Sequence, residues 1–178
     1  MKVLLGVTGS VAATLTPKLI AALIAAGHQV QIVATNASLY FWRPAEIELP
    51  VWLEEDEWPG EAYDKHATIK HIELREWADV LLIAPLTANT LAKMANGICD
   101  NLLTSVARAW ERNKPMVVAP AMNTKMWEHP LSAEHLNRLN NWYRLTVVNP
   151  VAKKLACGEQ GVGAMAEIET IVKVLKYT

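Results

Sequence analysis

The segment "VLLIAPLTANT" (residues 80–90) carries a short apolar run, Val80–Ala84, that passes directly into small polar residues. Four further runs of this kind are separated mostly by longer helix-like segments: Val3–Val7, Val30–Ala34, Met116–Ala119 and Leu145–Val148. Continuous apolar runs are typical of strands buried on both faces, and their alternation with helices is typical of parallel sheets. The sequence therefore predicts an α/β fold with a doubly wound parallel sheet.

Three segments between or after these runs have the pattern of helices. Val11–Ala26 is rich in Ala, Leu and Ile and ends before Gly27, with Pro17 expected to kink the helix or delay its start. Asn89–Trp110 and Ile168–Tyr177 are also predicted to be helical.

The segment Arg43–His66 contains Pro, Glu and Trp and is longer than an ordinary connection, which predicts an excursion with short elements of its own. No internal repeat or linker interrupts the rest of the pattern. With 178 residues and 52% hydrophobic residues, the chain can bury one core but is short for two. We therefore expect a single domain over residues 1–178.

Composition argues against several classes of partner. The net charge of −1 provides no basic field for nucleic acid. Cys99 and Cys157 cannot form a disulfide framework or a clustered zinc site and suit a reducing cytoplasm. The apolar run Val3–Val7 is too short for a signal peptide core, and no uncharged apolar stretch reaches the length of a membrane helix. We expect a cytoplasmic protein without a nucleic-acid, membrane or metal partner.

Ligands of doubly wound sheets bind outside the carboxyl ends of the strands, so the residues that follow each strand are candidates. Gly9 permits close backbone approach, and Ser10 can present a hydroxyl and an amide to a phosphate. A tight turn with an N-cap serine explains the same residues equally well. After the second strand, Thr35 and Ser38 offer further neutral donors, although this signal is weak by itself.

Two later loops strengthen the prediction of a site. Thr87–Thr90 opens a helix with residues small and polar enough for a flat ligand, although simple helix capping is the alternative. Asn123 follows a buried strand, where a carboxamide can bind a carboxylate or carbonyl, whereas Met126 and Trp127 suggest packing. The four loops together indicate one ligand site.

Three other features leave alternatives open. His71 precedes a core segment and is either a satisfied surface histidine or a catalytic one. The acidic run Glu54–Glu57 could form a cation site, but a solvated face is the more common explanation. The segment "LACGEQGVGAMAE" (residues 155–167) places Cys157 before three glycines, which suits a thiol on a flexible segment.

Four motifs in order resemble one family: "GSVAA" (9–13), "HIELREWADVLLIAPLTANTLAKMANGICDNLLT" (71–104), "PAMNTKMW" (120–127) and "LACGEQGVGAMAE" (155–167). The chain resembles the homo-oligomeric flavin-containing cysteine decarboxylases and, within them, the phosphopantothenoylcysteine decarboxylases of coenzyme A biosynthesis. The resemblance implies a flavodoxin-like three-layer α/β/α fold that binds FMN at a subunit interface. It also implies assembly as a homotrimer or as a homododecamer built of trimers.

The resemblance further implies which residues bind FMN. The phosphate and ribityl groups would contact the residues after the first two strands, Thr8, Gly9, Ser10, Thr35 and Ser38. The isoalloxazine ring would lie near Thr87, Ala88, Asn89, Thr90 and Ala121. The family commonly has serine in place of Thr87 and aspartate in place of Glu159, and both exchanges preserve the functional group.

The catalytic residues implied by the resemblance are His71, Asn123, which would grip the substrate carboxylate, and Cys157 as proton donor. Lys154 and Ala156 would contact substrate. The implied reaction converts 4′-phospho-N-pantothenoylcysteine to 4′-phosphopantetheine. In it, flavin oxidation of the substrate gives a thioaldehyde, loss of CO₂ gives an enethiolate, and re-reduction with a proton from Cys157 gives the product.

Two other functions remain as alternatives. An oxidative decarboxylase of peptide C-terminal cysteines shares the histidine and "PAMNTKMW" motifs but stops at the enethiol, so the presence of Cys157 argues against it. A non-catalytic flavoprotein regulator of a protein phosphatase belongs to a different class and typically carries a long acidic tail. In the decarboxylase interpretation, Gly158, Gly161 and Gly163 are expected to be the hinges of a flap that brings Cys157 to the substrate.

Overall fold

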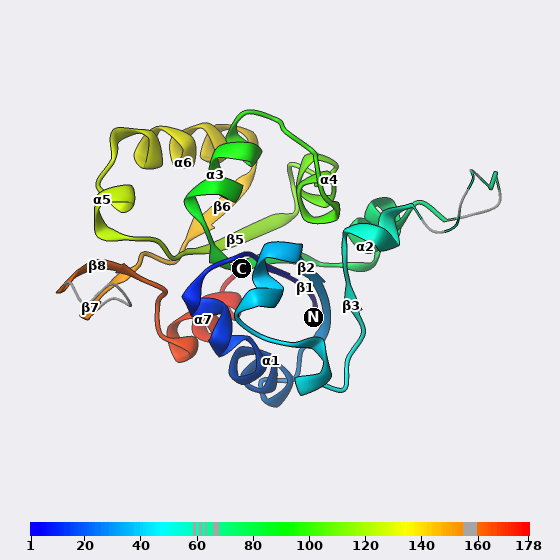
Figure 1. Cartoon of the computed structure of the whole chain (residues 1–178), viewed down its shortest axis with the longest axis horizontal. Coiled ribbons are helices and arrows are strands. Elements are labelled where there is room, and N and C mark those ends of the chain that lie inside the picture. The colour runs from blue at the N-terminus through cyan, green and yellow to red at the C-terminus, as the bar shows by residue number, and fades with distance from the viewer. Residues whose placement is uncertain (59, 61, 63, 66–67, 155–159) are drawn as a thin grey trace.

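The computed structural model describes the chain except residues 59, 61, 63, 66–67 and 155–159 and the side chains of residues 154 and 160. A sheet of six parallel strands lies at its centre (Figure 1). In spatial order, the strands are β3 (Val51–Trp52), β2 (Gln29–Ala34), β1 (Lys2–Val7), β4 (Val80–Leu86), β5 (Pro115–Pro120) and β6 (Arg144–Val147). The five predicted strands and the parallel sheet are therefore confirmed.

The strand order reverses between β1 and β4. From β1 the chain moves outward to β2 and β3 and then crosses back to pair β4 with the other side of β1. Without the two-residue edge strand β3, the order β2-β1-β4-β5-β6 is that of a flavodoxin-like sheet. The predicted fold class is confirmed, and the switch point puts the ends of β1 and β4 beside each other.

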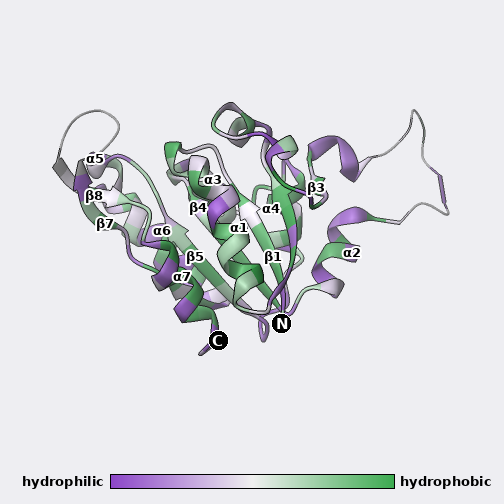
Figure 2. Cartoon of the chain, turned by 90° about the horizontal axis from the view of Figure 1, so that it is seen from below, coloured by the Kyte–Doolittle hydropathy of each residue, from purple (hydrophilic) through white to green (hydrophobic). Residues whose placement is uncertain are grey.

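Helices cover both faces of the sheet because β1 sends alternate side chains to opposite sides. Val3, Leu5 and Val7 pack on one face, and Leu4 packs on the other. The helices on the first face are α1 (Thr16–Ala25) and α7 (Ile168–Leu175). Those on the second face are α2 (Lys70–Trp77), α3 (Ala88–Ala95), α4 (Leu102–Arg108) and α6 (Pro130–Trp142). Figure 2 shows the strands as a largely hydrophobic layer between the helices, with hydrophilic residues on α2, α6 and α7, whereas α1 is largely hydrophobic.

The first predicted helix forms in two parts. A 3₁₀ helix, η1 (Val11–Leu15), precedes α1, and Pro17 occupies the first turn of α1, where a missing N–H removes no helical hydrogen bond. Pro17 thus coincides with the delayed start of the α-helix. At the other end, Gly27 adopts a φ of 83°, a conformation that glycine adopts without strain.

The prediction of one helix over Asn89–Trp110 is wrong. The chain breaks after α3, where Gly97 has a φ of 72°. Asn101 then caps α4, because its Oδ1 accepts a hydrogen bond from the Thr104 N–H at 2.9 Å. The break turns the chain so that α3 and α4 lie side by side, and it brings Asn101 to the ligand cavity described below.

The excursion between β2 and α2 has the short elements that were expected. They are the 3₁₀ helices η2 (Asn36–Tyr40), η3 (Pro44–Glu46) and η4 (Glu54–Glu57), together with β3. In the part of the chain that the structure describes, no helix is long and apolar enough to span a membrane.

An antiparallel hairpin of β7 (Val151–Lys154) and β8 (Gln160–Ala164) lies outside the main sheet, beside the short helix α5 (Thr124–Trp127) (Figure 1). Gly161 and Gly163 are strand residues here, and the prediction that they act as hinges of a flap stays a prediction, because the segment around Cys157 lies outside the described residues. A Cβ on Gly161 would lie 2.2 Å from Thr124 Oγ1, and a Cβ on Gly163 would lie 2.2 Å from the Met122 carbonyl oxygen. These glycines allow β8 to approach the chain around α5, whereas Gly158 lies outside the described residues.

Candidate functional site

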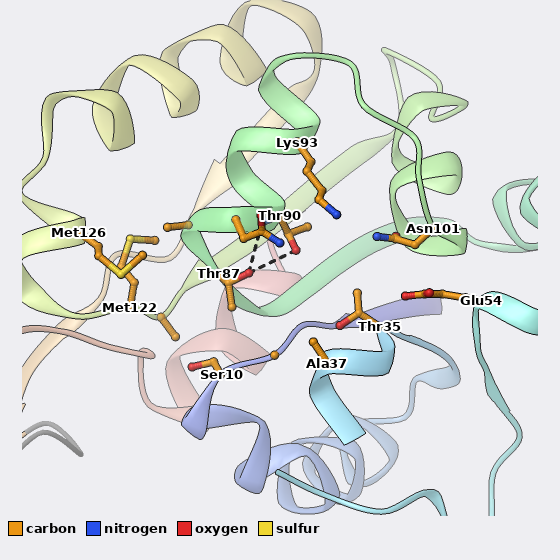
Figure 3. Close-up of a pocket in the computed structure, with 14 residues that line it drawn as sticks. Ser10, Thr35, Ala37, Glu54, Thr87, Thr90, Lys93, Asn101, Met122 and Met126 are labelled. Carbon is orange, nitrogen blue, oxygen red and sulfur yellow. Dashed lines mark hydrogen bonds between the residues drawn. The ribbon is translucent and has the colours of Figure 1, made fainter. Parts of the chain in front are cut away.

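A cavity of about 340 Å³ opens at the switch point of the sheet (Figure 3). Its size falls in the range of small-molecule sites. Eight of the ten residues predicted to bind a cofactor line it: Gly9, Ser10, Thr35, Thr87, Ala88, Asn89, Thr90 and Ala121. The topology therefore gathers residues that are up to 112 positions apart in the sequence.

The loop after β1 forms one wall of this cavity. A Cβ on Gly9 would lie 3.0 Å from the backbone carbonyl of Ala37, so only glycine lets this loop pack so closely against η2. Ser10 caps η1 by accepting a hydrogen bond from the Ala12 N–H at 3.3 Å. The predicted close backbone approach and the predicted N-cap thus occur together on one turn.

The start of α3 forms a second wall. Thr87 caps this helix through its hydroxyl, which accepts from the Thr90 N–H and bonds the Thr90 hydroxyl, both at 3.3 Å (Figure 3). Thr8 lies behind this wall, completely buried. Its hydroxyl donates to the Pro85 carbonyl at 2.7 Å and accepts from the Thr87 N–H at 3.0 Å. The Thr8 side chain therefore joins the ends of β1 and β4 and holds the wall in place.

Ser38 has a similar supporting position. It is completely buried, and its hydroxyl donates to the Thr35 carbonyl at 2.7 Å and accepts from Trp42 Nε1 at 3.3 Å. Thr35 itself reaches the cavity with a side chain that is only slightly exposed. Thr8 and Ser38 are thus the two predicted cofactor residues whose side chains stand behind the lining.

Five further lining residues with polar or large side chains were not predicted to bind ligand: Glu54, Lys93, Asn101, Met122 and Met126. Figure 3 shows the two methionines at one end of the cavity and Glu54 and Asn101 at the other. The Lys93 ammonium contacts Asp100 at 2.6 Å at the rim. The break between α3 and α4 explains why Asn101 was missed, and the assignment of Met126 to packing overlooked its exposed side chain.

Asn123 lies beside the methionine end of the cavity, at the N-cap of α5. Its Oδ1 accepts a hydrogen bond from the Lys125 N–H at 2.8 Å, which fixes the orientation of the carboxamide. The Met122 N–H on its other side donates to the Gly163 carbonyl at 2.9 Å. The position of Asn123 is therefore set both by α5 and by the hairpin.

His71 lies in the first turn of α2 and contacts Glu57. The backbone N–H of His71 donates to Glu57 Oε2 at 3.1 Å, and His71 Nδ1 forms a short hydrogen bond with Glu57 Oε1. Glu57 is only 6% exposed. The expectation that Glu54–Glu57 forms a solvated face is therefore wrong for Glu57.

One chain does not bring two of the predicted catalytic residues, His71 and Asn123, together. Figures 1 and 2 place α2, which carries His71, and α5, which follows Asn123, at opposite sides of the molecule. Cys157 and Ala156 lie outside the described residues, and Lys154 is described only by its backbone in β7. Among the described residues, no cluster of three or more His, Cys, Asp or Glu side chains could hold a metal ion.

The family model of the Flavoprotein family matches residues 1–178. The chain belongs to this family. The flavoprotein is 49% identical over 173 residues to the phosphopantothenoylcysteine decarboxylase of Mus musculus, covering 96% of this chain and 83% of that protein.

Two solved structures extend the similarity of this flavoprotein to three dimensions. One is a cysteine-to-serine mutant of PPC decarboxylase complexed with pantothenoylaminoethenethiol, with a TM-score of 0.90, 45% identity and coverage of 99% of this chain and 96% of that chain. The other is the FMN binding protein AtHal3, with a TM-score of 0.85, 46% identity and coverage of 99% and 95%.

The cavity of this flavoprotein suits a flavin. Ser10 and Thr35 are the N-cap residues of η1 and η2, and such positions suit the phosphate end of a ligand. Ala88 and Ala121 leave room for a flat ring, and the Asn89 amide can bond its polar edge. The donor set and the small residues therefore fit the cofactor that the family name implies.

Proposed function

We propose that this flavoprotein is an FMN-dependent phosphopantothenoylcysteine decarboxylase that converts 4′-phospho-N-pantothenoylcysteine to 4′-phosphopantetheine in coenzyme A biosynthesis. The similarity over nearly the whole chain to a PPC decarboxylase complexed with pantothenoylaminoethenethiol is the observation that carries the proposal. In this proposal, residues 1–178 form a single decarboxylase domain. A cytoplasmic location is part of it and rests on the low cysteine content.

The cofactor residues have distinct tasks in this proposal. Gly9, Ser10 and Thr35 hold the phosphate and ribityl groups, while Thr87–Thr90 and Ala121 hold the ring. Bound FMN would supply the two-electron oxidation that turns the thiol end of the substrate into the electron sink that a simple cysteine carboxylate lacks, and the protein supplies binding and orientation.

The substrate residues act at the carboxyl and thiol ends of the substrate. Asn123 holds the departing carboxylate through its amide without adding a positive charge that would stabilise the bound carboxylate. His71 assists deprotonation and orients the substrate, and Cys157 returns a proton after CO₂ has left. Lys154 and Ala156 contact substrate beside Cys157.

Assembly completes the site in this proposal. Because α2, which carries His71, and α5, which Asn123 caps, lie on opposite sides of one chain (Figure 1), the two residues meet only when neighbouring subunits contribute one each. A homotrimer, alone or as the unit of a dodecamer, provides such repeated heterologous contacts.

The test is to purify the protein, record its visible absorbance, and measure CO₂ release from phosphopantothenoylcysteine and from a peptide that ends in cysteine. We expect a yellow protein that acts on the phosphorylated substrate. Preferential release from the peptide would support the oxidative peptide decarboxylase instead. A protein that binds flavin and releases CO₂ from neither substrate would support the regulatory alternative, and a colourless, inactive protein after FMN addition would overturn the proposal.

A further inference from the structure

Glu57 is a buried carboxylate that points at the proposed catalytic histidine. It is the last residue of η4 and is 6% exposed, whereas the His71 side chain is 23% exposed. The two carboxylate oxygens divide their contacts, because Oε2 accepts from the His71 backbone N–H and Oε1 bonds Nδ1 of the ring. The carboxylate thus holds both the backbone and the side chain of His71.

This contact constrains the chemistry of the imidazole. An ionised carboxylate only accepts hydrogen bonds, so the Nδ1 atom that faces it must carry a proton. In a neutral ring, Nε2 is then the nitrogen with the available lone pair. The more exposed ring therefore presents its basic nitrogen away from the buried Glu57.

The start of α2 is held from a second direction. The Lys70 ammonium lies 3.9 Å from the centroid of the Trp52 ring, and Trp52 Nε1 donates to Gln31 Oε1 at 3.1 Å. Lys70 also pairs with Glu73 at 2.9 Å. These contacts anchor the residue before His71 to the edge of the sheet, so that Glu57 acts on a backbone that is already fixed.

We infer that Glu57 is the positioning residue that sets the tautomer and orientation of His71. The inference rests on the proposed function for the role of His71 in turnover, but the tautomer itself is independent of that function. A partner that orients a catalytic imidazole through Nδ1 is a recurrent arrangement, because it leaves Nε2 in a defined direction.

The variant Glu57→Gln tests this inference. Glutamine has an acceptor oxygen at only one of the two positions that Oε1 and Oε2 occupy, so it cannot accept from both N–H groups of His71 in the wild-type geometry. Its oxygen can accept from the backbone N–H while its NH₂ donates to Nδ1, which moves the ring proton to Nε2. We expect kcat to fall by about 10-fold to 100-fold with KM nearly unchanged and the flavin absorbance retained.

Two further variants separate positioning from folding. Glu57→Asp keeps two acceptor oxygens and is expected to retain more turnover than Glu57→Gln. Glu55→Gln is the matched control, since Glu55 is an exposed glutamate two positions earlier, and it is expected to match the wild type. An equal loss of kcat in Glu55→Gln and Glu57→Gln would overturn the inference.

The decisive measurement is the protonation state of Nδ1 in the His71 ring. Magic-angle-spinning ¹⁵N NMR of histidine-labelled protein, assigned with His71→Asn, should show a protonated Nδ1 in the wild type and an unprotonated Nδ1 in Glu57→Gln. An unprotonated Nδ1 in the wild type would overturn the inference even if turnover falls. Failure of the proposed function would appear differently, as a wild type that releases no CO₂ whatever its tautomer.

A double-mutant cycle gives the last check. In a His71→Asn background, Glu57→Gln should lower the residual kcat no further, because Glu57 acts only through His71. A further loss of similar size in that background would assign Glu57 another role and refute the positioning one.

Discussion

Gly163→Ala should damage the site from outside the cavity. The new Cβ would lie 2.2 Å from the Met122 carbonyl oxygen, and ordinary van der Waals contact begins at 3.4 Å. The obstacle is backbone, so β8 and the segment around Met122 must separate by about 1.2 Å along this contact. The same movement strains the 2.9 Å hydrogen bond from the Met122 N–H to the Gly163 carbonyl.

Two consequences of this separation can be measured. Overpacking of this kind costs about 1–3 kcal/mol of unfolding free energy, which lowers the melting temperature by about 2–4 °C per kcal/mol for a chain of this size. Displacement of the neighbouring Asn123 by about 1 Å should reduce kcat/KM on the order of 100-fold. Differential scanning calorimetry and the CO₂ assay give the two values.

Gly161→Ala is the matched comparison for this prediction. Its new Cβ meets the Thr124 side chain, with 2.2 Å to Oγ1 and 3.0 Å to Cγ2, and Thr124→Ala removes both atoms. The double variant Gly161→Ala/Thr124→Ala should therefore recover much of the loss, whereas no side-chain deletion at Met122 should rescue Gly163→Ala. Wild-type melting and turnover in Gly163→Ala would refute the close-packing argument.

Three further perturbations address the wall, the pH response and the proposed proton donor. Thr8→Val removes the partner of the buried Pro85 carbonyl and of the half-buried Thr87 N–H. The change should cost about 1–3 kcal/mol for the buried group and weaken FMN binding, measured by thermal unfolding and flavin titration against the exposed control Thr14→Val. Burial, followed by the positive charges of the N-terminus and Lys176, lowers the pKa of His28 below 6.5. The unfolded chain then binds more protons at this site, so the free energy of unfolding should fall as the pH drops below about 6.5. The fall should be less steep in His28→Gln than in the wild type, and equal slopes in the two proteins would contradict this. Cys157→Ser should keep FMN and release CO₂ but stop at an oxidised enethiol, and normal formation of 4′-phosphopantetheine would exclude Cys157 as proton donor.

The sheet was predictable from sequence because each central strand is buried on both faces. Val80–Ala84 and the similar runs therefore appear as uninterrupted apolar residues. The break between α3 and α4 was not predicted, although Gly97 and Asn101 are common helix boundary residues. The Leu and Ala residues on both sides of Gly97 and Asn101 favour a continuous helix. The hydrogen bond from the Thr104 N–H that caps α4 becomes evident only in the folded chain.

The candidate site was predictable where topology alone assembles it. Ser10, Thr35 and Thr87 each follow a strand, and parallel strands end at the same edge of the sheet. Glu57 was not predictable, because its partner lies 14 positions later and nothing local separates it from the neighbouring acidic residues. Residues that act through long-range pairing leave little trace in a single sequence.

The separation of α2 and α5 has a genetic consequence. If neighbouring subunits complete each proposed site, a chain that lacks a functional His71 and a chain that lacks a functional Asn123 each retain the residue that the other has lost. Two inactive alleles expressed in one cell would then restore activity at those interfaces where the intact residues meet. Conversely, a single defective allele would also inactivate sites that contain a normal chain, so partial dominance is expected.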